Sequence, residues 1–223
     1  MQPAESICLT VTDLGCERDD RALFQGLSFS ASRGEIWQIT GANGTGKTTL
    51  LRILAGLHGF YEGQVTWASP LAPDLLYLGH QPGVREELNA RENLQYSCAL
   101  SGQNAGKAQR ARIDQALAAV DLYGFEDVAA ARLSAGQKRR IALARLWLCN
   151  QAELGGKPGL GDKRVWLLDE PYTAIDQDGI RRLDARLHQA AAAGTLVIYT
   201  SHHQVADGVR RLHLHEQGVE VLA

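Results

Sequence analysis

The sequence lacks the patterns that mark several classes of protein. It has no apolar run near the roughly 20 residues that a membrane-spanning helix requires. Its first residues, MQPAESICLT, have neither the basic segment nor the apolar core of a secretory signal. None of the four cysteines forms a CxxC pair, so neither a zinc site nor a redox centre is indicated. Scattered single thiols favour a reducing cytosol over a disulfide-stabilised fold.

An excess of charge of one sign is also missing. The 23 Lys and Arg residues nearly balance the 25 Asp and Glu residues, which leaves a net charge of −2. A domain that binds nucleic acid usually carries a basic excess, so no nucleic acid is expected as a partner. Hydrophobic residues make up 45% of the 223 residues, enough for a substantial core. We therefore expect a soluble globular protein that meets a membrane only through a partner.

Strand and helix patterns alternate at both ends of the chain. Apolar runs predict strands, and residues with helical spacing predict helices. The expected strands cover residues 35–40, 64–67, 75–78, 164–169 and 195–200, the helices cover 47–55 and 178–193, and a hairpin covers 211–222. This alternation predicts an α/β fold with a parallel sheet.

The middle of the chain, from about residue 85 to 145, carries no strand signal. Asn89 and Glu92 form a capping box that opens a helix through Leu100, and residues 105–120 form a second helical segment. Ser134 and Gln137 form another capping box, for a helix that reaches residue 148. The glycine-rich residues 150–163 are expected to form a loop. We expect a single domain over residues 1–223, with a core of 1–84 and 146–223 and an all-helical subdomain at about 85–145.

A glycine-rich segment between the first predicted strand and helix indicates phosphate binding. Gly41-Ala-Asn-Gly-Thr-Gly46-Lys47-Thr48 matches the P-loop pattern GxxxxGK[ST] in its required context. Backbone N–H groups and a helix N-terminus would bind the phosphates of ATP, Lys47 would reach the outer phosphates, and Thr48 would bind Mg²⁺. The alternative is a merely flexible loop. The expected ATP-binding residues are Gly41, Ala42, Asn43, Gly44, Thr45, Gly46, Lys47, Thr48 and Thr49.

Two carboxylates follow a buried strand in Val165-Trp-Leu-Leu-Asp169-Glu170. Asp169 stands where a Walker B aspartate holds Mg²⁺, and Glu170 stands where a carboxylate can polarise the attacking water. Paired acids after a strand can also simply cap the next helix. Their occurrence after a P-loop in the same chain favours the catalytic interpretation.

A third motif, Leu133-Ser-Ala-Gly-Gln137 and the helix that follows it, resembles the signature of the ABC transporter ATPases. Leu133-Ser-Ala-Gly-Gln137 is followed by Lys-Arg-Arg-Ile-Ala-Leu-Ala-Arg145, and its serine and helix N-terminus suit an anion. A plain capping box is the alternative. The resemblance implies a P-loop NTPase core of RecA-like type with the inserted all-helical subdomain. It also implies that two subunits form a homodimer on binding ATP, in which Ser134, Ala135, Gly136 and Gln137 of one subunit contact the ATP of the other.

Further residues take their roles from the same resemblance. Gln81 matches the Q-loop glutamine, which reaches Mg²⁺ and the membrane partner, and Asp176 matches the D-loop aspartate. His202 matches the switch histidine, a catalytic contact to the γ-phosphate, although spacing also allows His203. Many members stack adenine on an aromatic residue where Arg18 stands; a guanidinium can also stack on a purine.

Within the family, the motifs look most similar to the heme-exporter ATPases of bacterial cytochrome c maturation. The phrases that carry this likeness include Gly79-His-Gln-Pro-Gly83 and Thr173-Ala-Ile-Asp176. They imply a permease partner and a peripheral place on the cytoplasmic face of the inner membrane. Transport of another small substrate is the runner-up. Three other functions fit less well. A P-loop kinase would not need the signature motif, and an ATPase acting on soluble targets is usually longer than this chain. A nucleotide sensor that does not hydrolyse ATP would not need Glu170.

Overall fold

The computed structural model describes residues 7–19, 21–102, 107–149, 163–202, 208–215 and 218–222. The chain divides into two compact units. Unit 1 consists of Met1–His80, Arg164–Pro171 and Leu187–Ala223, and unit 2 of Gln81–Lys163 and Tyr172–Arg186. The helices are α1 (Lys47–Leu54), α2 (Leu71–Asp74), α3 (Ala90–Leu100), α4 (Lys107–Ala119), α5 (Ala135–Ala144) and α6 (Gln177–Ala192). The strands are β1 (Ile7–Arg18), β2 (Arg21–Ser32), β3 (Ile36–Gly41), β4 (Glu62–Trp67), β5 (Leu75–Leu78), β6 (Val165–Leu168), β7 (Leu196–Thr200), β8 (Arg210–His215) and β9 (Gly218–Leu222).

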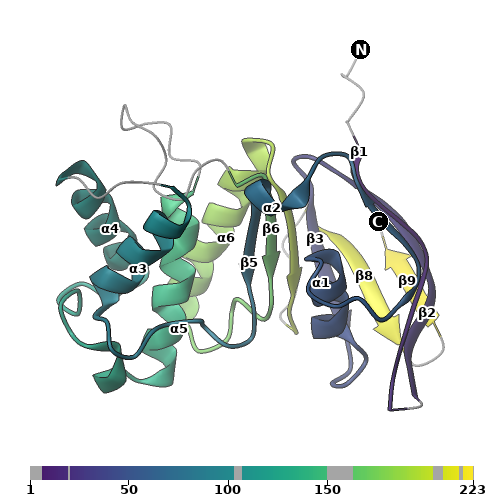
Figure 1. Ribbon diagram of the computed structural model, residues 1–223, viewed down its shortest axis with the longest axis horizontal. Coiled ribbons are helices and arrows are strands. Elements are labelled where there is room, and N and C mark those ends of the chain that lie inside the picture. Colours follow the sequence, from purple (N-terminus) through teal and green to yellow (C-terminus); the bar gives the residue numbers. More distant parts are fainter. Residues whose placement is uncertain are drawn as a thin grey trace. The chain divides into compact units, whose positions relative to one another are not determined.

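Unit 1 contains a six-stranded sheet in the order β5-β6-β7-β3-β8-β9 (Figure 1). Neighbouring strands from β5 to β8 pair in parallel, and β9 pairs antiparallel with β8. The central strands β6 and β7 are buried along their whole length, as expected for parallel strands that are covered on both faces. The predicted α/β fold with a parallel sheet is therefore confirmed, as is the terminal hairpin.

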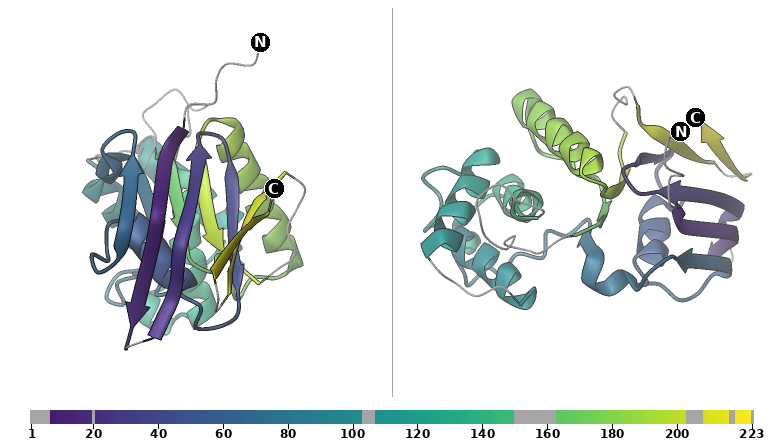
Figure 2. Two further views of the ribbon diagram at one scale, coloured as in Figure 1. Left: turned by 90° about the vertical axis from the view of Figure 1, so that its right-hand side faces the viewer. Right: turned by 90° about the horizontal axis from the view of Figure 1, so that it is seen from above.

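A second sheet in unit 1 was not predicted from the sequence. Strands β2, β1 and β4 form an antiparallel sheet in that order, and β1 and β2 run side by side (Figure 2, left). The pairing of β1 with β2 shifts register at several points between Ile7 and Glu17. Each shift exchanges the face to which the following side chains point, so the alternation that identifies a strand is interrupted. Strand β4 was predicted, but it pairs with β1 instead of joining the parallel sheet.

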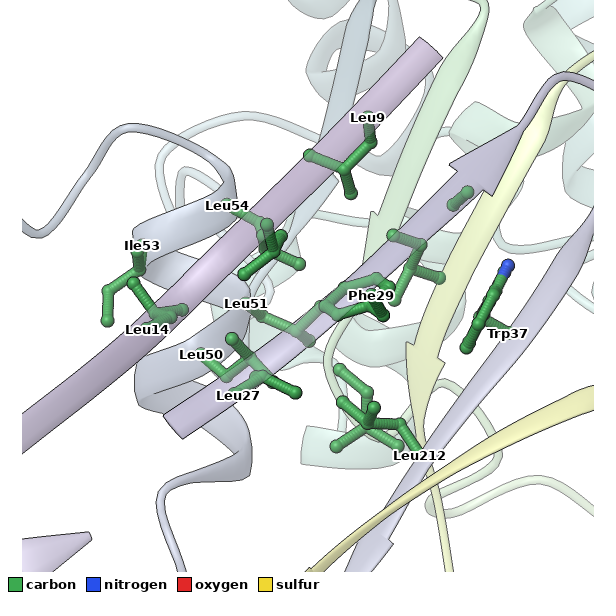
Figure 3. Packing of buried hydrophobic residues seen from close by; sticks show 14 of the residues in the cluster. Leu9, Leu14, Leu27, Phe29, Trp37, Leu50, Leu51, Ile53, Leu54 and Leu212 are labelled. Atoms are coloured by element: carbon green, nitrogen blue, oxygen red, sulfur yellow. The ribbon is translucent and has the colours of Figure 1, made fainter. Parts of the chain in front are cut away.

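The main hydrophobic core lies in unit 1 and joins both sheets to α1 (Figure 3). Leu50, Leu51 and Leu54 of α1 are completely buried. The ring centroids of Phe29 and Trp37 are 5.2 Å apart and tilted to each other. Since α1 follows the glycine-rich segment directly, this packing anchors the segment at its carboxyl end.

Unit 2 contains α3, α4 and α5, which pack against one another (Figure 1). Both predicted capping boxes are present, at Asn89 with Glu92 and at Ser134 with Gln137. Helix α5 ends at Ala144 and the chain continues as a 3₁₀ turn over Arg145–Leu148, so the predicted helix tightens in its last turn. Arg91 is buried, and its guanidinium forms ion pairs with Asp114 and Asp127. These contacts link α3 to α4 and to the segment that follows α4.

The two units differ from the predicted division of the chain. Unit 2 also takes residues 146–163 and 172–186, and α6 begins in unit 2 and ends in unit 1. The interpretation of the chain as one ATPase domain with a helical subdomain stays a prediction. The predicted loop at 150–163 and the start of the predicted 105–120 helix lie largely outside the described residues. Among the residues that are described, no helix is both long and apolar enough to cross a membrane.

Candidate active site

The glycine-rich segment forms a tight loop between β3 and α1. Gly41 has a φ of +146°, and a Cβ atom built on it would lie 2.4 Å from the carbonyl oxygen of Leu214, so only glycine fits there. Gly46, with a φ of +93°, precedes the first residue of α1 and makes no side-chain cap. The first turn of α1 has no acidic residue either. An uncapped helix N-terminus of this kind suits an anion.

Lys47 is buried beneath the loop. Its Nζ atom donates hydrogen bonds to the carbonyl oxygens of Gly41 and Ala42, each at 2.9 Å. Burial lowers the pKa of the Lys47 ammonium, and the carboxylates of Glu170 and Asp169 oppose this shift. The Lys47 ammonium therefore lies against the loop and near the carboxylates of Glu170 and Asp169, where it could reach an anion bound by the loop.

Thr48 and Asp169 meet although 121 residues separate them in the sequence. The Thr48 hydroxyl lies 2.9 Å from Oδ2 and 3.2 Å from Oδ1 of Asp169. The Asp169 side chain is buried at the end of β6, whereas Thr48 is exposed in the first turn of α1. Hydroxyl and carboxylate oxygens are the ligands that Mg²⁺ prefers, so this pair fits the metal that the sequence predicts.

Glu170 and His202 lie together beside the P-loop. Nε2 of His202 is 3.5 Å from Oε1 of Glu170, which follows Asp169 at the end of β6. The hydroxyl of Thr200 links this pair to Asp169: it donates to Oδ1 of Asp169 at 2.8 Å and accepts a hydrogen bond from the backbone N–H of Glu170, also at 2.8 Å. Thr200 was not predicted from the sequence, and only its position two residues before His202 could have indicated it.

An open cleft in unit 1 is lined by several of the residues predicted from the sequence. Eight predicted residues line it, together with Leu23 and His80, which were not predicted. The side chain of Arg18 is 74% exposed and its Nε lies 3.3 Å from Oδ2 of Asp19. Its stacking on a base stays a prediction. The predicted residues that line the cleft are Arg18, Asn43, Gly44, Gly46, Lys47, Thr48, Thr49 and Glu170.

The residues predicted to form the signature motif, the D-loop and the Q-loop belong to unit 2. Ser134 accepts a hydrogen bond from the backbone N–H of Gln137 at 3.2 Å, and Gln137 accepts one from the N–H of Ser134 at 2.9 Å. A Cβ atom on Gly136 would make an ordinary contact, 3.6 Å from that of Ala174, so the signature segment and the residues before Asp176 are neighbours.

Asp176 accepts a hydrogen bond from the backbone N–H of Gly179 in the first turn of α6, at 2.8 Å. Gln81 is the first residue of unit 2. The roles of both residues at the nucleotide therefore stay predictions, as do those of Ser134 and Gln137. His203, the alternative to His202, lies outside the described residues.

Comparison with known proteins gives a consistent result. The sequence model of the ABC transporter family matches residues 24–155. The chain is 65% identical over 214 residues to the cytochrome c biogenesis ATP-binding export protein CcmA of Alcanivorax borkumensis, covering 96% of this chain and 90% of the relative. It is 48% identical over 217 residues to the CcmA protein of Salmonella typhi, covering 92% and 96% of the two chains.

Solved structures share the fold at lower sequence identity. One is the dimeric ATP-binding cassette MJ0796 in a post-hydrolysis state, bound to ADP and Pi. Its TM-score is 0.79 at 22% sequence identity, and the match covers 95% of this chain and 96% of the MJ0796 chain. A Pyrococcus furiosus protein described as a putative ABC transporter ATP-binding protein has a TM-score of 0.76 at 22% identity, with coverage of 94% and 98%. These likenesses show the fold.

Proposed function

The chain belongs to the ABC transporter family, and we propose that it is the ATP-hydrolysing subunit that drives a membrane permease in cytochrome c biogenesis. The observation that carries the catalytic part is that Lys47, Thr48 and Glu170 line one cleft of unit 1, with Asp169 in contact with Thr48 and His202 next to Glu170. These residues include a phosphate-binding lysine, an oxygen pair suited to Mg²⁺ and a carboxylate beside an imidazole. ATP hydrolysis needs these three kinds of group.

Each residue has a distinct role at the phosphates. The loop from Gly41 to Gly46 and the N-terminus of α1 bind the phosphate chain, and Lys47 turns its ammonium from the loop carbonyls to the outer phosphates. Thr48 and Asp169, with Gln81, would hold Mg²⁺, which would supply positive charge to offset that of the phosphates. Thr49 lines the same cleft. Arg18 stacks on the purine.

Hydrolysis itself rests on the carboxylate and the imidazole. Glu170 accepts a hydrogen bond from the attacking water and orients it toward the γ-phosphate. His202 would contact the γ-phosphate while it lies close to Glu170. Departure of the phosphate would therefore change the contacts of both side chains. Their separation of 3.5 Å supports this joint action.

A second copy of the chain completes the site. Ser134, Ala135, Gly136 and Gln137 would close on the ATP that the other copy holds, because the α5 N-terminus and the serine hydroxyl form a second anion site. Asp176 would lie at the same interface. The dimeric cassette MJ0796, which shares the fold, supports this assembly. ATP binding would then close the dimer and phosphate release would reopen it. Hydrolysis would thus shift the population from closed dimers to open ones.

The membrane partner is an inner-membrane permease, and its contact surface is expected at Gln81–Glu92. The chain itself would then be peripheral on the cytoplasmic face of that membrane. The assignment to heme delivery for c-type cytochromes is supported by the 65% identity to a cytochrome c biogenesis export protein over 96% of the chain. No nucleic acid is needed for any step.

The cellular role can be tested with Lys47→Ala in cells of the source organism. Their c-type cytochromes are stained for covalent heme, and b-type cytochromes serve as the control. Selective loss of the c-type bands is expected, with normal amounts of the variant protein. Normal c-type bands would contradict the cytochrome assignment and direct the search to a permease for another small substrate.

A further inference from the structure

We propose that Thr200 is a positioning residue for ATP hydrolysis, which holds the Asp169 carboxylate and the Glu170 backbone in their catalytic arrangement. The proposal rests on the proposed ATPase function. Thr200 is the last residue of β7, and its Cα atom pairs with Ile39 of β3. It is completely buried, and its hydroxyl makes hydrogen bonds both to the Asp169 carboxylate and to the backbone of Glu170.

The direction of the two hydrogen bonds is determined by chemistry. A backbone N–H can only donate, so the Thr200 oxygen is the acceptor for Glu170 at 2.8 Å. The hydroxyl has a single proton, and that proton is directed to Oδ1 of Asp169, also at 2.8 Å. A valine has the same shape but could make neither bond. Thr200 thus connects the metal-binding carboxylate with the backbone of the residue that orients the water.

The backbone of Glu170 needs such a contact. Its φ of +50° lies in the left-handed region, which is unfavourable for a residue other than glycine. Residues in this conformation persist where surrounding bonds hold them. The hydrogen bond from the Glu170 N–H to Thr200 is one such bond, and the turn it stabilises sets the direction in which the Glu170 side chain leaves β6.

Asp169 receives hydrogen bonds from two hydroxyl groups with different surroundings. Thr48 is exposed in the cleft, and in the proposed function its oxygen turns to the metal. Thr200 is buried between β6 and β3 and lines no part of the cleft described for this site. Its hydrogen bond can therefore keep the Asp169 carboxylate oriented while Thr48 changes partner.

The test compares three variants of the full-length chain. Thr200→Val removes the hydroxyl at constant shape, and Thr200→Ser keeps the hydroxyl while removing a methyl group. Thr195→Val is the matched control, because Thr195 is an equally buried threonine just before the other end of β7. Phosphate release at varied ATP and Mg²⁺, ATP binding in EDTA and thermal unfolding are measured for each variant.

We expect Thr200→Val to lower kcat about tenfold to a hundredfold, since a small misplacement of catalytic groups has effects of this size. The Mg²⁺ concentration for half-maximal turnover should rise, and ATP binding in EDTA should stay within about twofold because Lys47 and the loop are untouched. Thr200→Ser should restore most of kcat, and Thr195→Val should keep it.

A merely structural role would give a different pattern. The proposal would be overturned if Thr200→Val and Thr195→Val lowered the unfolding temperature by the same amount and had equal kcat values. Should Thr200→Val fail to fold, a Thr200→Ser chain with less than a tenth of wild-type kcat would also overturn it, because the hydroxyl is kept. A wild-type chain that binds ATP but releases no phosphate would contradict the proposed function instead.

Discussion

Nε2 of His202 lies 3.5 Å from Oε1 of Glu170, at the carboxyl ends of neighbouring strands β7 and β6. The pair brings an imidazole ring next to the carboxylate that is proposed to orient water. Parallel strands place their carboxyl ends at one edge of the sheet, and this is the edge where ligands of α/β proteins bind.

Glu170→Gln should block hydrolysis and leave ATP binding intact. The amide keeps the size of the side chain but cannot act as a base, so turnover should fall about a hundredfold to ten-thousandfold. Phosphate release measures turnover, and gel filtration with ATP should show a trapped dimer. Glu62→Gln, an exposed position on β4, serves as the control. A Glu170→Gln chain that releases phosphate at the normal rate would show that another group acts as the base.

Lys47→Ala should weaken nucleotide binding and turnover together. Loss of a charge-assisted hydrogen bond to phosphate should raise the Kd for ATP about tenfold to a hundredfold. Titration with a fluorescent ATP analogue measures the change. Arg52→Ala removes an exposed cation from the last turn of the same helix and should bind normally. Equal affinity in the two variants would refute the role of Lys47.

Gly41→Ala should destabilise unit 1 far more than Gly56→Ala. Both glycines have positive φ angles, +146° and +70°, so each alanine has a strained backbone costing about 1–3 kcal/mol. Only at Gly41 does the new Cβ also meet an atom, the carbonyl oxygen of Leu214 at 2.4 Å, because Gly56 has nothing within 4 Å. Urea unfolding of both variants measures the difference. Equal midpoints would show that the loop can move away from β8.

Asn89→Ala should lower the free energy of unfolding of unit 2 by about 1 kcal/mol, because it removes the cap of α3. The Asn89 side chain accepts a hydrogen bond from the N–H of Glu92 at 2.8 Å. Asn89→Ser retains a capping oxygen and should cost only a few tenths of a kcal/mol. Chemical unfolding followed by circular dichroism compares the two. Identical losses would indicate that the cap contributes nothing here.

Alkaline pH should destabilise the protein through Cys149. Burial raises the pKa of this thiol from 9.0 to about 12, although the nearby Arg186 and Arg145 act in the opposite direction. The folded chain therefore keeps the proton longer than the unfolded chain, and stability falls as the pH rises from about 9 toward 12. Urea unfolding across this range should show a steeper loss for the native chain than for Cys149→Ala. Parallel curves would exclude this thiol as the cause.

The four thiols should also resist modification in the folded protein. All four cysteines are buried, and burial raises the pKa of each. Because the thiolate is the reacting form, alkylation near pH 8 should be slow until denaturant is added.

Local motifs were the most predictable part of this molecule. The P-loop, the strand before Asp169 and both capping boxes depend on residues within a few positions of one another. Hydrogen bonds of this short range are encoded in the order of the residues, as at Asn89 and Glu92. The sequence also predicted α1, β5 and β7 nearly to the residue, because an uninterrupted apolar pattern bounded by glycine or polar residues leaves few alternatives.

The antiparallel sheet illustrates what such patterns miss. Strands β1 and β2 contain several register shifts, and each one reverses the inside and outside of the strand. Their apolar residues, such as Leu14 and Phe24, are buried by contacts with α1 and other strands. No window of neighbouring residues contains that information.

By itself, the sequence predicted the groups on which the proposed chemistry depends: a loop with the P-loop pattern, a pair of acids after a strand and a second helix end that suits an anion. Only the tertiary structure decided that Thr48 contacts Asp169 and that Thr200 connects Asp169 with Glu170. The reason is physical. The residues of each contact are 30 or more positions apart, and they meet because parallel strands bring their carboxyl ends to one edge of the sheet.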